Sequence, residues 1–295
     1  LVRGAVGVAR RAGVSELAIG LTLVGAMTSA PEMVVSVQAA LAGQAGLALG
    51  NVVGSNTANL LLIMGAGGLV RPLVAKRAMM LRDGGINLAS GLLLAGLALD
   101  GAFQRYDGLL LTACLISYIA WTYRAEHRVR RQNIHVKEAR ELETPVMPLW
   151  VAGLATGGGL VALVWGADLL VEGAVGIARR AGVSEAVVGL SIVAVGTSLP
   201  ELATSVVAAW RRHTDVAVGN AVGSCLFNTF GIVGVSSALA PYAADPEVTR
   251  LDLPVMLAVS AGVMALLAWR QKLGRVESAL FVALYAAYAV WLFGR

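Results

Sequence analysis

The stretch Thr28-Ser29-Ala30-Pro31-Glu32 places a proline and a carboxylate close together in the middle of a long hydrophobic run. The pattern returns 169 residues later as Thr197-Ser198-Leu199-Pro200-Glu201. A carboxylate at bilayer depth is costly, so it normally lines a polar cavity and binds or relays a charged species. A proline beside it removes a backbone donor and leaves carbonyl oxygens available near the acid. The two stretches therefore predict one cation site built from two halves.

The composition around these stretches is that of a membrane protein. The chain has 295 residues, of which 57% are hydrophobic and 14% charged, and its mean hydropathy is +0.74. Apolar runs recur with lengths of about 20 residues, which suffice to cross a bilayer core of about 30 Å as a helix. These values predict an integral, multi-pass protein in a lipid bilayer and argue against a soluble domain. The net charge of +5 is then interpreted as membrane topology and not as affinity for nucleic acid.

The apolar runs predict an all-α polytopic protein with ten transmembrane helices. The first helix is expected to be truncated at the N-terminus, because the run Trp150 to Leu169 precedes Leu170 but nothing equivalent precedes Leu1. About 20 further residues are therefore expected upstream. The other nine predicted spans are Val14 to Ala42, Leu47 to Val70, Gly84 to Leu99, Gly108 to Tyr123, Pro148 to Ile177, Val183 to Trp210, Val216 to Leu239, Leu251 to Trp269 and Val276 to Phe293.

An internal repeat organises the chain. Residues 1–65 align with residues 170–234 without a gap, and 34 of the 65 positions are identical. Each repeat unit holds five spans. Because five is an odd number, the second copy starts on the opposite side of the membrane and must be inverted relative to the first. Inverted repeats are typical of secondary transporters, whose substrate site lies between the halves. We expect a first half at 1–123 with its repeat at about 14–70, a charged link at 124–147, and a second half at 148–295 with its repeat at about 183–239.

The basic residues predict an orientation. If the N-terminus is outside, the inner connections hold 17 of the 23 Lys and Arg residues, as the positive-inside rule requires. Only the pair Arg179-Arg180 argues against this assignment, and the repeat itself dictates that pair. The link 124–147 is then expected to be a solvated cytoplasmic loop. The inner connections carry Arg10-Arg11, Arg71 to Arg82, Arg124 to Arg140, Arg211-Arg212 and Arg270 to Arg275.

Polar side chains recur at helical spacing around the two glutamates. Glycines at Gly46, Gly50 and Gly54, and again at Gly219 and Gly223, form small-residue ladders that let helices approach closely. Such close packing would bring the polar groups of neighbouring spans together. The polar positions are Ser29, Glu32 and Ser36, then Asn51, Ser55 and Asn59, matched in the second copy by Ser198, Glu201 and Ser205, then Asn220, Ser224 and Asn228.

Carboxylates, hydroxyls, amide oxygens and opened carbonyls are hard oxygen donors, which suit calcium and sodium ions. Thiolate and imidazole sites for zinc, copper or iron are not indicated, because Cys114 and Cys225 lie in apolar runs as free thiols and the histidines fall in connecting segments. No cofactor is expected. A lone Ser or Asn in a membrane helix is usually a packing residue, and Asn51 and Asn220 remain open between ligand and packing roles. The paired glutamates have few structural uses.

The sequence resembles the cation/calcium exchanger superfamily, within its prokaryotic sodium/calcium exchanger branch. Gly196 to Leu202 with Gly219 to Ser224, and Thr28 to Glu32 with Gly50 to Asn56, look like the two alpha-repeats of that family. The resemblance implies two inverted five-helix halves around four central cation sites. It implies calcium binding by Glu32 and Glu201 with the carbonyls of Thr28 and Thr197, sodium binding by Ser29, Ser55, Ser198 and Ser224, and a central polar pair in Asn59 and Asn228.

Several features of the sequence differ from the pattern of that family or of its relatives. Met27 stands where the second copy has Gly196, so we expect the first break to differ in shape. Cys225 replaces the residue equivalent to Asn56 and is not assigned as a ligand. Asn59 and Asn228 are both neutral, whereas related potassium-dependent exchangers carry an extra aspartate. Proton-coupled relatives have a glutamate in the Gly-Asn motif, which Gly50 to Ser55 lacks, so sodium is the favoured coupling ion.

These features predict a secondary antiporter that exports calcium from the cytoplasm in exchange for entering sodium, by alternating access. A monomer is sufficient to form such a site. The alternative within the same class is a proton-coupled exchanger of calcium or another divalent cation, because carboxylates also serve protons. A passive cation channel is the alternative from a different class. An enzyme is not indicated, since no nucleophile, metal centre or cofactor motif accompanies the glutamates.

Overall fold

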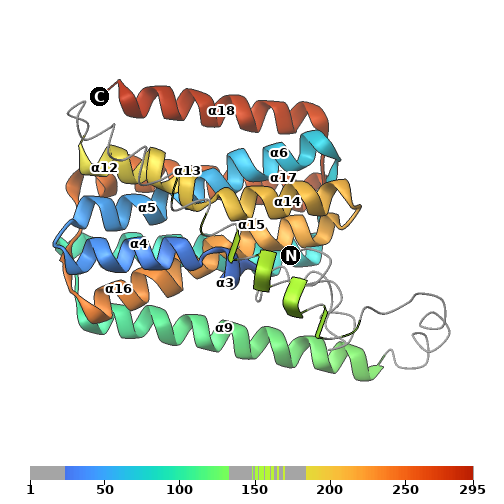
Figure 1. Ribbon diagram of the computed structural model, residues 1–295, viewed down its shortest axis with the longest axis horizontal. Coiled ribbons are helices and arrows are strands. Elements are labelled where there is room, and N and C mark those ends of the chain that lie inside the picture. Colours follow the sequence, from blue (N-terminus) through green and yellow to red (C-terminus); the bar gives the residue numbers. More distant parts are fainter. Residues whose placement is uncertain are drawn as a thin grey trace.

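The computed structural model describes residues 24–132 and 184–294, together with isolated residues between 148 and 169 (Figure 1). The predicted partial first helix, most of the charged link and the start of the second repeat at Leu170 to Gly182 lie outside the described residues. The helix predicted to end at Tyr123 continues to Gln132, because Arg, Ala and Glu are good helix formers and a charged helix end is readily solvated.

The first half is built of helices with two short strands between them. α4 and α5 are joined by the turn at Ala42–Gln44, where Gly43 has a positive φ of 73°. The described elements are α3 (Gly25–Thr28), α4 (Ala30–Leu41), α5 (Ala45–Ala58), η2 (Asn59–Ile63), α6 (Met64–Val70), β1 (Leu73–Val74), α7 (Arg77–Met79), η3 (Met80–Gly84), α8 (Gly85–Leu97), η4 (Ala98–Asp100), β2 (Ala102–Phe103) and α9 (Arg105–Gln132).

The second half repeats this order at a shift of about 169 residues, so the sequence repeat is also a repeat of local structure. A π-helical segment follows the second long buried helix in both halves, at η2 and at η7. The described elements are α12 (Glu185–Val188), η6 (Gly189–Val193), α13 (Ala194–Thr197), α14 (Leu199–Trp210), α15 (Thr214–Leu226), η7 (Phe227–Ile232), α16 (Val233–Leu239), β3 (Tyr242–Ala243), η8 (Val248–Asp252), α17 (Leu253–Arg270), β4 (Lys272–Leu273) and α18 (Arg275–Phe293).

Two continuous helical rods form the centre of the bundle. They run over Ala45–Val70 and Thr214–Leu239, and their apolar stretches are almost fully buried. Each rod contacts broken helices of the opposite half: α5 packs on α13 and α6 packs on α14, while α15 packs on α3 and α16 on α4. The two halves are therefore interleaved, and residues far apart in sequence meet at the breaks.

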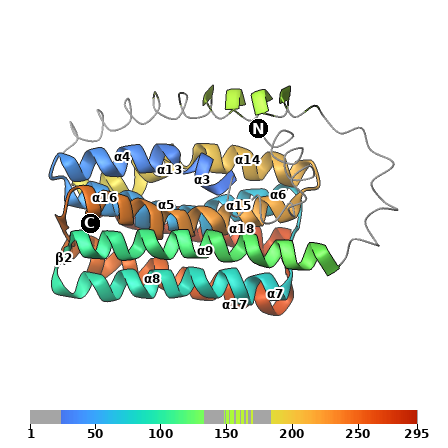
Figure 2. The same cartoon turned by 90° about the horizontal axis from the view of Figure 1, so that it is seen from below.

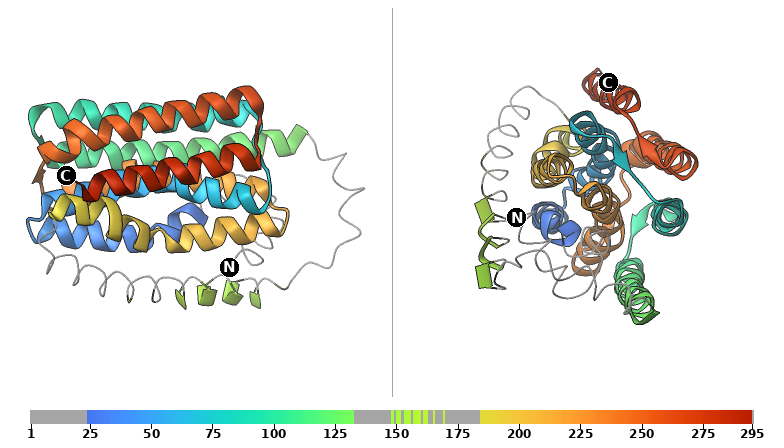
Figure 3. Two further views of the ribbon diagram at one scale, coloured as in Figure 1. Left: turned by 90° about the horizontal axis from the view of Figure 1, so that it is seen from above. Right: turned by 90° about the vertical axis from the view of Figure 1, so that its right-hand side faces the viewer.

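Longer helices lie outside this centre. In Figure 1, α18 and α9 run along opposite edges of the bundle, and α8 and α17 lie together in the view from below (Figure 2). The end-on view shows these helices beside the buried rods (Figure 3). Many of their large apolar side chains are exposed, among them Leu92, Leu109 and Leu284. Such a surface is typical of a protein that faces lipid.

The span count predicted from sequence is only partly matched. By length and composition, four described helices can cross a membrane, or five if Ala186–Thr197 and Leu199–Trp210, bent by 44°, form one span. Four predicted spans include residues outside the described part, and others are divided by π-helical or 3-10 segments. Ten transmembrane helices therefore stays a prediction.

Two short antiparallel ribbons connect the halves, and the sequence did not predict them. β1 pairs with β4 through Leu73 and Leu273, and β2 pairs with β3 through Phe103 and Tyr242. Both pairings join a strand of the first half to one of the second. Phe103 and Tyr242 also pack ring against ring at 5.6 Å between centroids. The ribbons fix the ends of the outer helices relative to the buried rods.

The predicted glycine ladder of α5 lies against the broken helix of the second half. A Cβ atom at Gly50 would lie 3.0 Å from the Ala186 carbonyl oxygen, and one at Gly54 would lie 2.5 Å from the Leu190 carbonyl oxygen. Backbone approach this close requires the absence of a side chain. The ladder therefore sets the position of α5 relative to η6 and α13.

Replacing Gly54 by alanine is expected to lower thermal stability. The added Cβ would also lie 2.8 Å from the Ala194 Cβ, and overpacking of this kind costs about 1–3 kcal/mol. Gly262→Ala is the matched control, because Gly262 is exposed in α17 with nothing within 4 Å of a Cβ. Thermal unfolding of both purified variants in detergent checks this; equal melting temperatures would contradict the packing role.

Candidate cation-binding site

The two Pro-Glu stretches form two matching helix breaks. α3 ends at Thr28 and α4 begins at Ala30, with Ser29 between them at φ −81° and ψ 9°. In the second half Ser198 has φ −82° and ψ 6° between α13 and α14. The expectation that Met27 gives the first break a different shape is therefore wrong. Proline lies in the first turn of the helix that follows each break, where its missing N–H is tolerated.

Each glutamate is hydrogen-bonded to the other half of the molecule. The Ser198 hydroxyl donates to Glu32 Oε1 at 2.9 Å, and the Ser29 hydroxyl donates to Glu201 Oε1 at 2.9 Å. Both carboxyl groups are fully buried, with 0% exposure. The serine of one break thus holds the carboxyl group of the other, and the two sequence halves meet in one site.

Asn51 and Asn220 connect the same breaks through their carboxamides. Asn51 Oδ1 accepts a hydrogen bond from the Thr197 hydroxyl at 3.3 Å, while its Nδ2 donates to the Glu32 carbonyl at 3.3 Å and to Ser36 Oγ at 2.9 Å. Asn220 repeats this arrangement with the Thr28 hydroxyl at 3.2 Å, the Glu201 carbonyl at 3.2 Å and Ser205 Oγ at 3.0 Å. The hydrogen-bonding capacity of both carboxamides is largely used within the protein, which favours the packing role left open for them.

The third pair of predicted residues lies at the π-helical segments. Asn59 is the first residue of η2, and Asn228 lies in η7. π-helical turns occur frequently at functional sites, because the extra residue redirects side chains and loosens the backbone hydrogen-bond ladder. Both asparagines are fully buried. The sequence indicated these side chains but carried no signal for the π-helical backbone.

Several buried side-chain oxygens of the predicted site residues accept no hydrogen bond. Within the described residues, the only buried carboxyl or carboxamide oxygens without a partner are Glu32 Oε2, Glu201 Oε2, Asn59 Oδ1 and Asn228 Oδ1. All four belong to residues predicted as cation ligands. Buried acceptors are normally satisfied, so a cluster of free ones is suited to a cation. The cation would be transported substrate, and its donors would be hard oxygens.

All ten predicted site residues are buried, but their contacts are not fully symmetric. The Ser224 hydroxyl donates to Glu201 Oε1 at 3.3 Å, whereas the equivalent Ser55 hydroxyl donates to the Ala194 carbonyl at 3.4 Å. Ser55 is thus not placed on Glu32. Among the described residues, sequence reasoning missed Thr229, whose hydroxyl accepts from Asn56 Nδ2 at 2.9 Å. Its place directly after Asn228 was the only feature of the sequence that could have identified Thr229 as part of the site.

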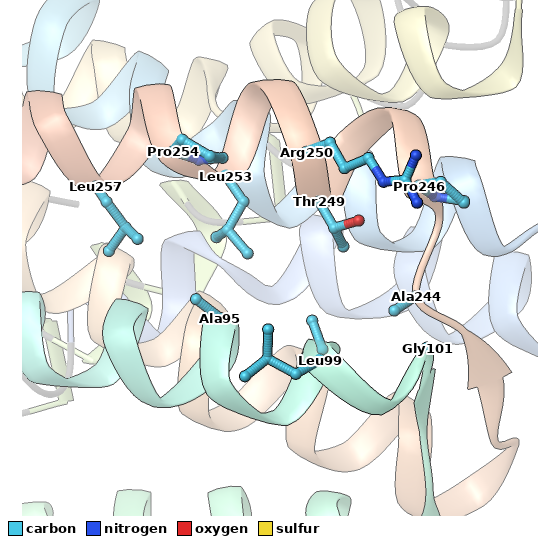
Figure 4. A pocket seen from close by; sticks show the side chains of 11 residues that line it. Ala95, Leu99, Gly101, Ala244, Pro246, Thr249, Arg250, Leu253, Pro254 and Leu257 are labelled. Atoms are coloured by element: carbon cyan, nitrogen blue, oxygen red, sulfur yellow. The ribbon is translucent and has the colours of Figure 1, made fainter.

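Two cavities lie away from this cluster. One of about 330 Å³ opens between η8–α17 and α8–η4, where Thr249, Arg250 and Leu253 face Ala95 and Leu99 (Figure 4). The other, of about 300 Å³, lies at α7–η3 and the end of α17. Neither contains a predicted cation ligand. The candidate site is therefore the buried polar cluster and not an open pocket.

Metal sites of other chemistry are not evident in the part of the chain that the structure describes. It contains no group of three or more His, Cys, Asp or Glu side chains suited to a metal ion. Cys114 and Cys225 are free, as predicted. The donors at the breaks are two carboxyl groups, hydroxyls and carboxamides, so any cation held there would be one that prefers oxygen.

Comparison with known families gives a match over nearly the whole chain. The family model for the sodium/calcium exchanger protein matches residues 1–124 and 151–294. Inner membrane protein YrbG of Escherichia coli (strain K12) is 33% identical over 290 residues, which cover 96% of this chain and 87% of the relative. The sodium/calcium exchanger MaX1 of Methanosarcina acetivorans is 30% identical over 325 residues, covering 99% of this chain and 93% of the relative.

The fold is also that of a solved structure. The sodium-calcium exchanger NCX_Mj, soaked with 10 mM Na⁺ and 10 mM Sr²⁺, matches with a TM-score of 0.78 and 30% sequence identity. The match covers 97% of this chain and 90% of that chain. The match confirms the all-helical membrane fold that the apolar runs predict, but it does not confirm the number of helices.

Proposed function

The chain belongs to the sodium/calcium exchanger family, and from that premise we propose that it exports calcium from the cytoplasm in exchange for entering sodium. Members of this family are secondary transporters and not enzymes, so the chain is a membrane antiporter of cations. The observation that carries the ion assignment is the cluster of buried oxygens without donors on Glu32, Glu201, Asn59 and Asn228. The named exchange of sodium and calcium by MaX1 supports it.

Glu32 and Glu201 are proposed to bind calcium together with the carbonyls of Thr28 and Thr197. Two ionised carboxylates balance one divalent cation or the sodium ions that replace it. Ser29, Ser55, Ser198 and Ser224 are proposed as sodium ligands. When a cation enters, the Ser29 and Ser198 hydroxyls can turn from donating to the carboxylates to presenting their oxygen atoms to the ion. Competition between calcium and sodium for shared oxygens is the physical basis of exchange.

The orientation is part of the proposal. Ten transmembrane helices would form two inverted halves around the site, with the link 124–147 on the cytoplasmic side of a prokaryotic inner membrane. The name of YrbG as an inner membrane protein supports this location. The repeated order of elements supports the repeat. Exchange that moves net positive charge inward would be driven by the membrane potential at about 2.3 kcal/mol per charge per 100 mV.

Calcium uptake into sodium-loaded vesicles is expected to rise on dilution into sodium-free buffer, because sodium leaving down its gradient drives calcium in. The same vesicles without the purified protein are the control. A pH gradient imposed without sodium should drive little uptake. Uptake that follows the pH gradient and ignores sodium would instead establish proton coupling. A channel would be indicated if unlabelled internal calcium failed to accelerate entry of labelled calcium.

A further inference from the structure

The central polar cluster is anchored on one side only. Asn56 and Cys225 occupy equivalent positions of the two repeats, 169 residues apart. Asn56 Oδ1 accepts a hydrogen bond from Asn228 Nδ2 at 3.1 Å, so the Asn228 carboxamide is fixed with its own Oδ1 free. Asn56 is itself held by its donor bond to Thr229. On this side, the free Asn228 Oδ1 is held in a fixed position in which it can bind a cation.

The other side lacks this anchor. Asn59 is the equivalent of Asn228, yet neither its Nδ2 nor its Oδ1 makes a hydrogen bond to a nitrogen or oxygen atom, although the side chain is fully buried, and its neighbour at the equivalent position is the Cys225 sulfur. The residue that would supply the acceptor is Cys225, whose thiol donates to the Asn56 carbonyl at 3.7 Å. Sulfur is a weak acceptor. The equivalent of Thr229 is Leu60, which has no polar side-chain atom.

We infer that Cys225 determines the cation affinity of the site by leaving the Asn59 carboxamide unanchored. This rests on the function proposed above, in which Asn59 and Asn228 face the transported cation. A ligand that must be ordered when the ion binds contributes less to affinity than one already fixed, because the ordering costs free energy. Asn228 is the fixed ligand of the pair, and Asn59 is the free one. Residue 225 is thus a positioning residue that acts through Asn59.

The repeat supplies matched variants for the test. Cys225→Asn gives Asn59 Nδ2 the acceptor that Asn56 gives Asn228, and it is expected to lower the Kd for Ca²⁺ by about threefold to tenfold, the value of one buried hydrogen bond. Asn56→Cys removes the anchor of Asn228 and is expected to raise the Kd by a similar factor. Cys114→Ser is the control, because Cys114 lies on α9, away from the cluster, and this substitution should leave the Kd for Ca²⁺ unchanged. Equilibrium binding of Ca²⁺ to purified protein is measured alongside sodium-driven uptake.

A second set of variants separates positioning from a change in packing. Asn59→Ala is expected to weaken Ca²⁺ binding less than Asn228→Ala does in the natural sequence. In the Cys225→Asn background the two substitutions should cost about the same, whereas a Cys225→Val background, which changes packing without supplying an acceptor, should leave the difference between them in place. Because these variants leave Asn56 in place, they test whether residue 225 acts through Asn59 even if Asn56→Cys fails to fold.

The outcomes distinguish the inference from the proposed function. If sodium fails to drive calcium uptake, the proposed function is overturned, and the binding measurements still judge residue 225. If exchange is present but Cys225→Asn leaves the Ca²⁺ Kd unchanged and Asn59→Ala costs the same in both backgrounds, the inference is overturned. A lowered Kd together with the changed cost of Asn59→Ala supports it.

Discussion

Replacing Glu201 by glutamine is expected to reduce sodium-driven calcium exchange to the background of protein-free vesicles, while the protein still inserts and folds. Glutamine retains the shape of the side chain and an Oε1 atom that can accept the hydrogen bonds of Ser29 and Ser224. It removes the negative charge, which is the main attraction for a divalent cation in a site closed to water. Vesicle uptake of labelled calcium, with expression and melting temperature as folding checks, measures the result.

Glu32→Gln is expected to give the same loss, because Glu32 is equally buried and receives the equivalent bond from Ser198. The control is Glu277→Gln. Glu277 lies in the first turn of α18 and is paired with Arg270 at 2.7 Å, and surface pairs of this kind contribute little. Exchange that persists in Glu201→Gln or Glu32→Gln would remove that residue from the ion site.

The site could be predicted from sequence to the extent that it depends on the repeat. Glu32 and Glu201 recur at the same place in the two copies of the sequence repeat, each in an apolar span, and repeats of secondary transporters place the substrate site between the halves. The cross-bonds Ser29 to Glu201 and Ser198 to Glu32 are the structural result. Local patterns sufficed here because a carboxylate in an apolar span has few alternatives to a polar interior.

Backbone detail could not be predicted in the same way. The π-helical start at Asn59 and the ribbons β1–β4 and β2–β3 depend on contacts between distant segments, which hydrophobic periodicity does not encode. Met27 was expected to alter the first break, but Ser29 has the same conformation as Ser198. Both breaks share the pattern Thr-Ser-x-Pro-Glu and matching bonds across the interface. Methionine in place of glycine two residues before the break serine leaves the conformation of that serine unchanged.

Replacing Asn51 by leucine is expected to reduce calcium affinity and exchange by about tenfold or more, because two or three buried hydrogen bonds are lost at about 1 kcal/mol each. Asn51 is bonded to the Thr197 hydroxyl of one break and the Glu32 carbonyl of the other. Leucine has a similar volume and removes only the polar contacts. The Ca²⁺ concentration that gives half-maximal exchange, measured with the maximal rate, separates weakened ion binding from loss of active protein.

Asn220→Leu is expected to have an equal effect, since Asn220 makes the equivalent bonds to Thr28 and Glu201. Thr57→Val is the matched control on α5: Thr57 is also fully buried, but its hydroxyl donates only to the Val53 carbonyl of the same helix at 3.0 Å. If the two asparagine variants lower melting temperature yet leave calcium affinity unchanged, the carboxamides support only the fold. A shift in affinity confined to Asn51→Leu and Asn220→Leu would show that the bonds between the breaks position Glu32 and Glu201 for the cation.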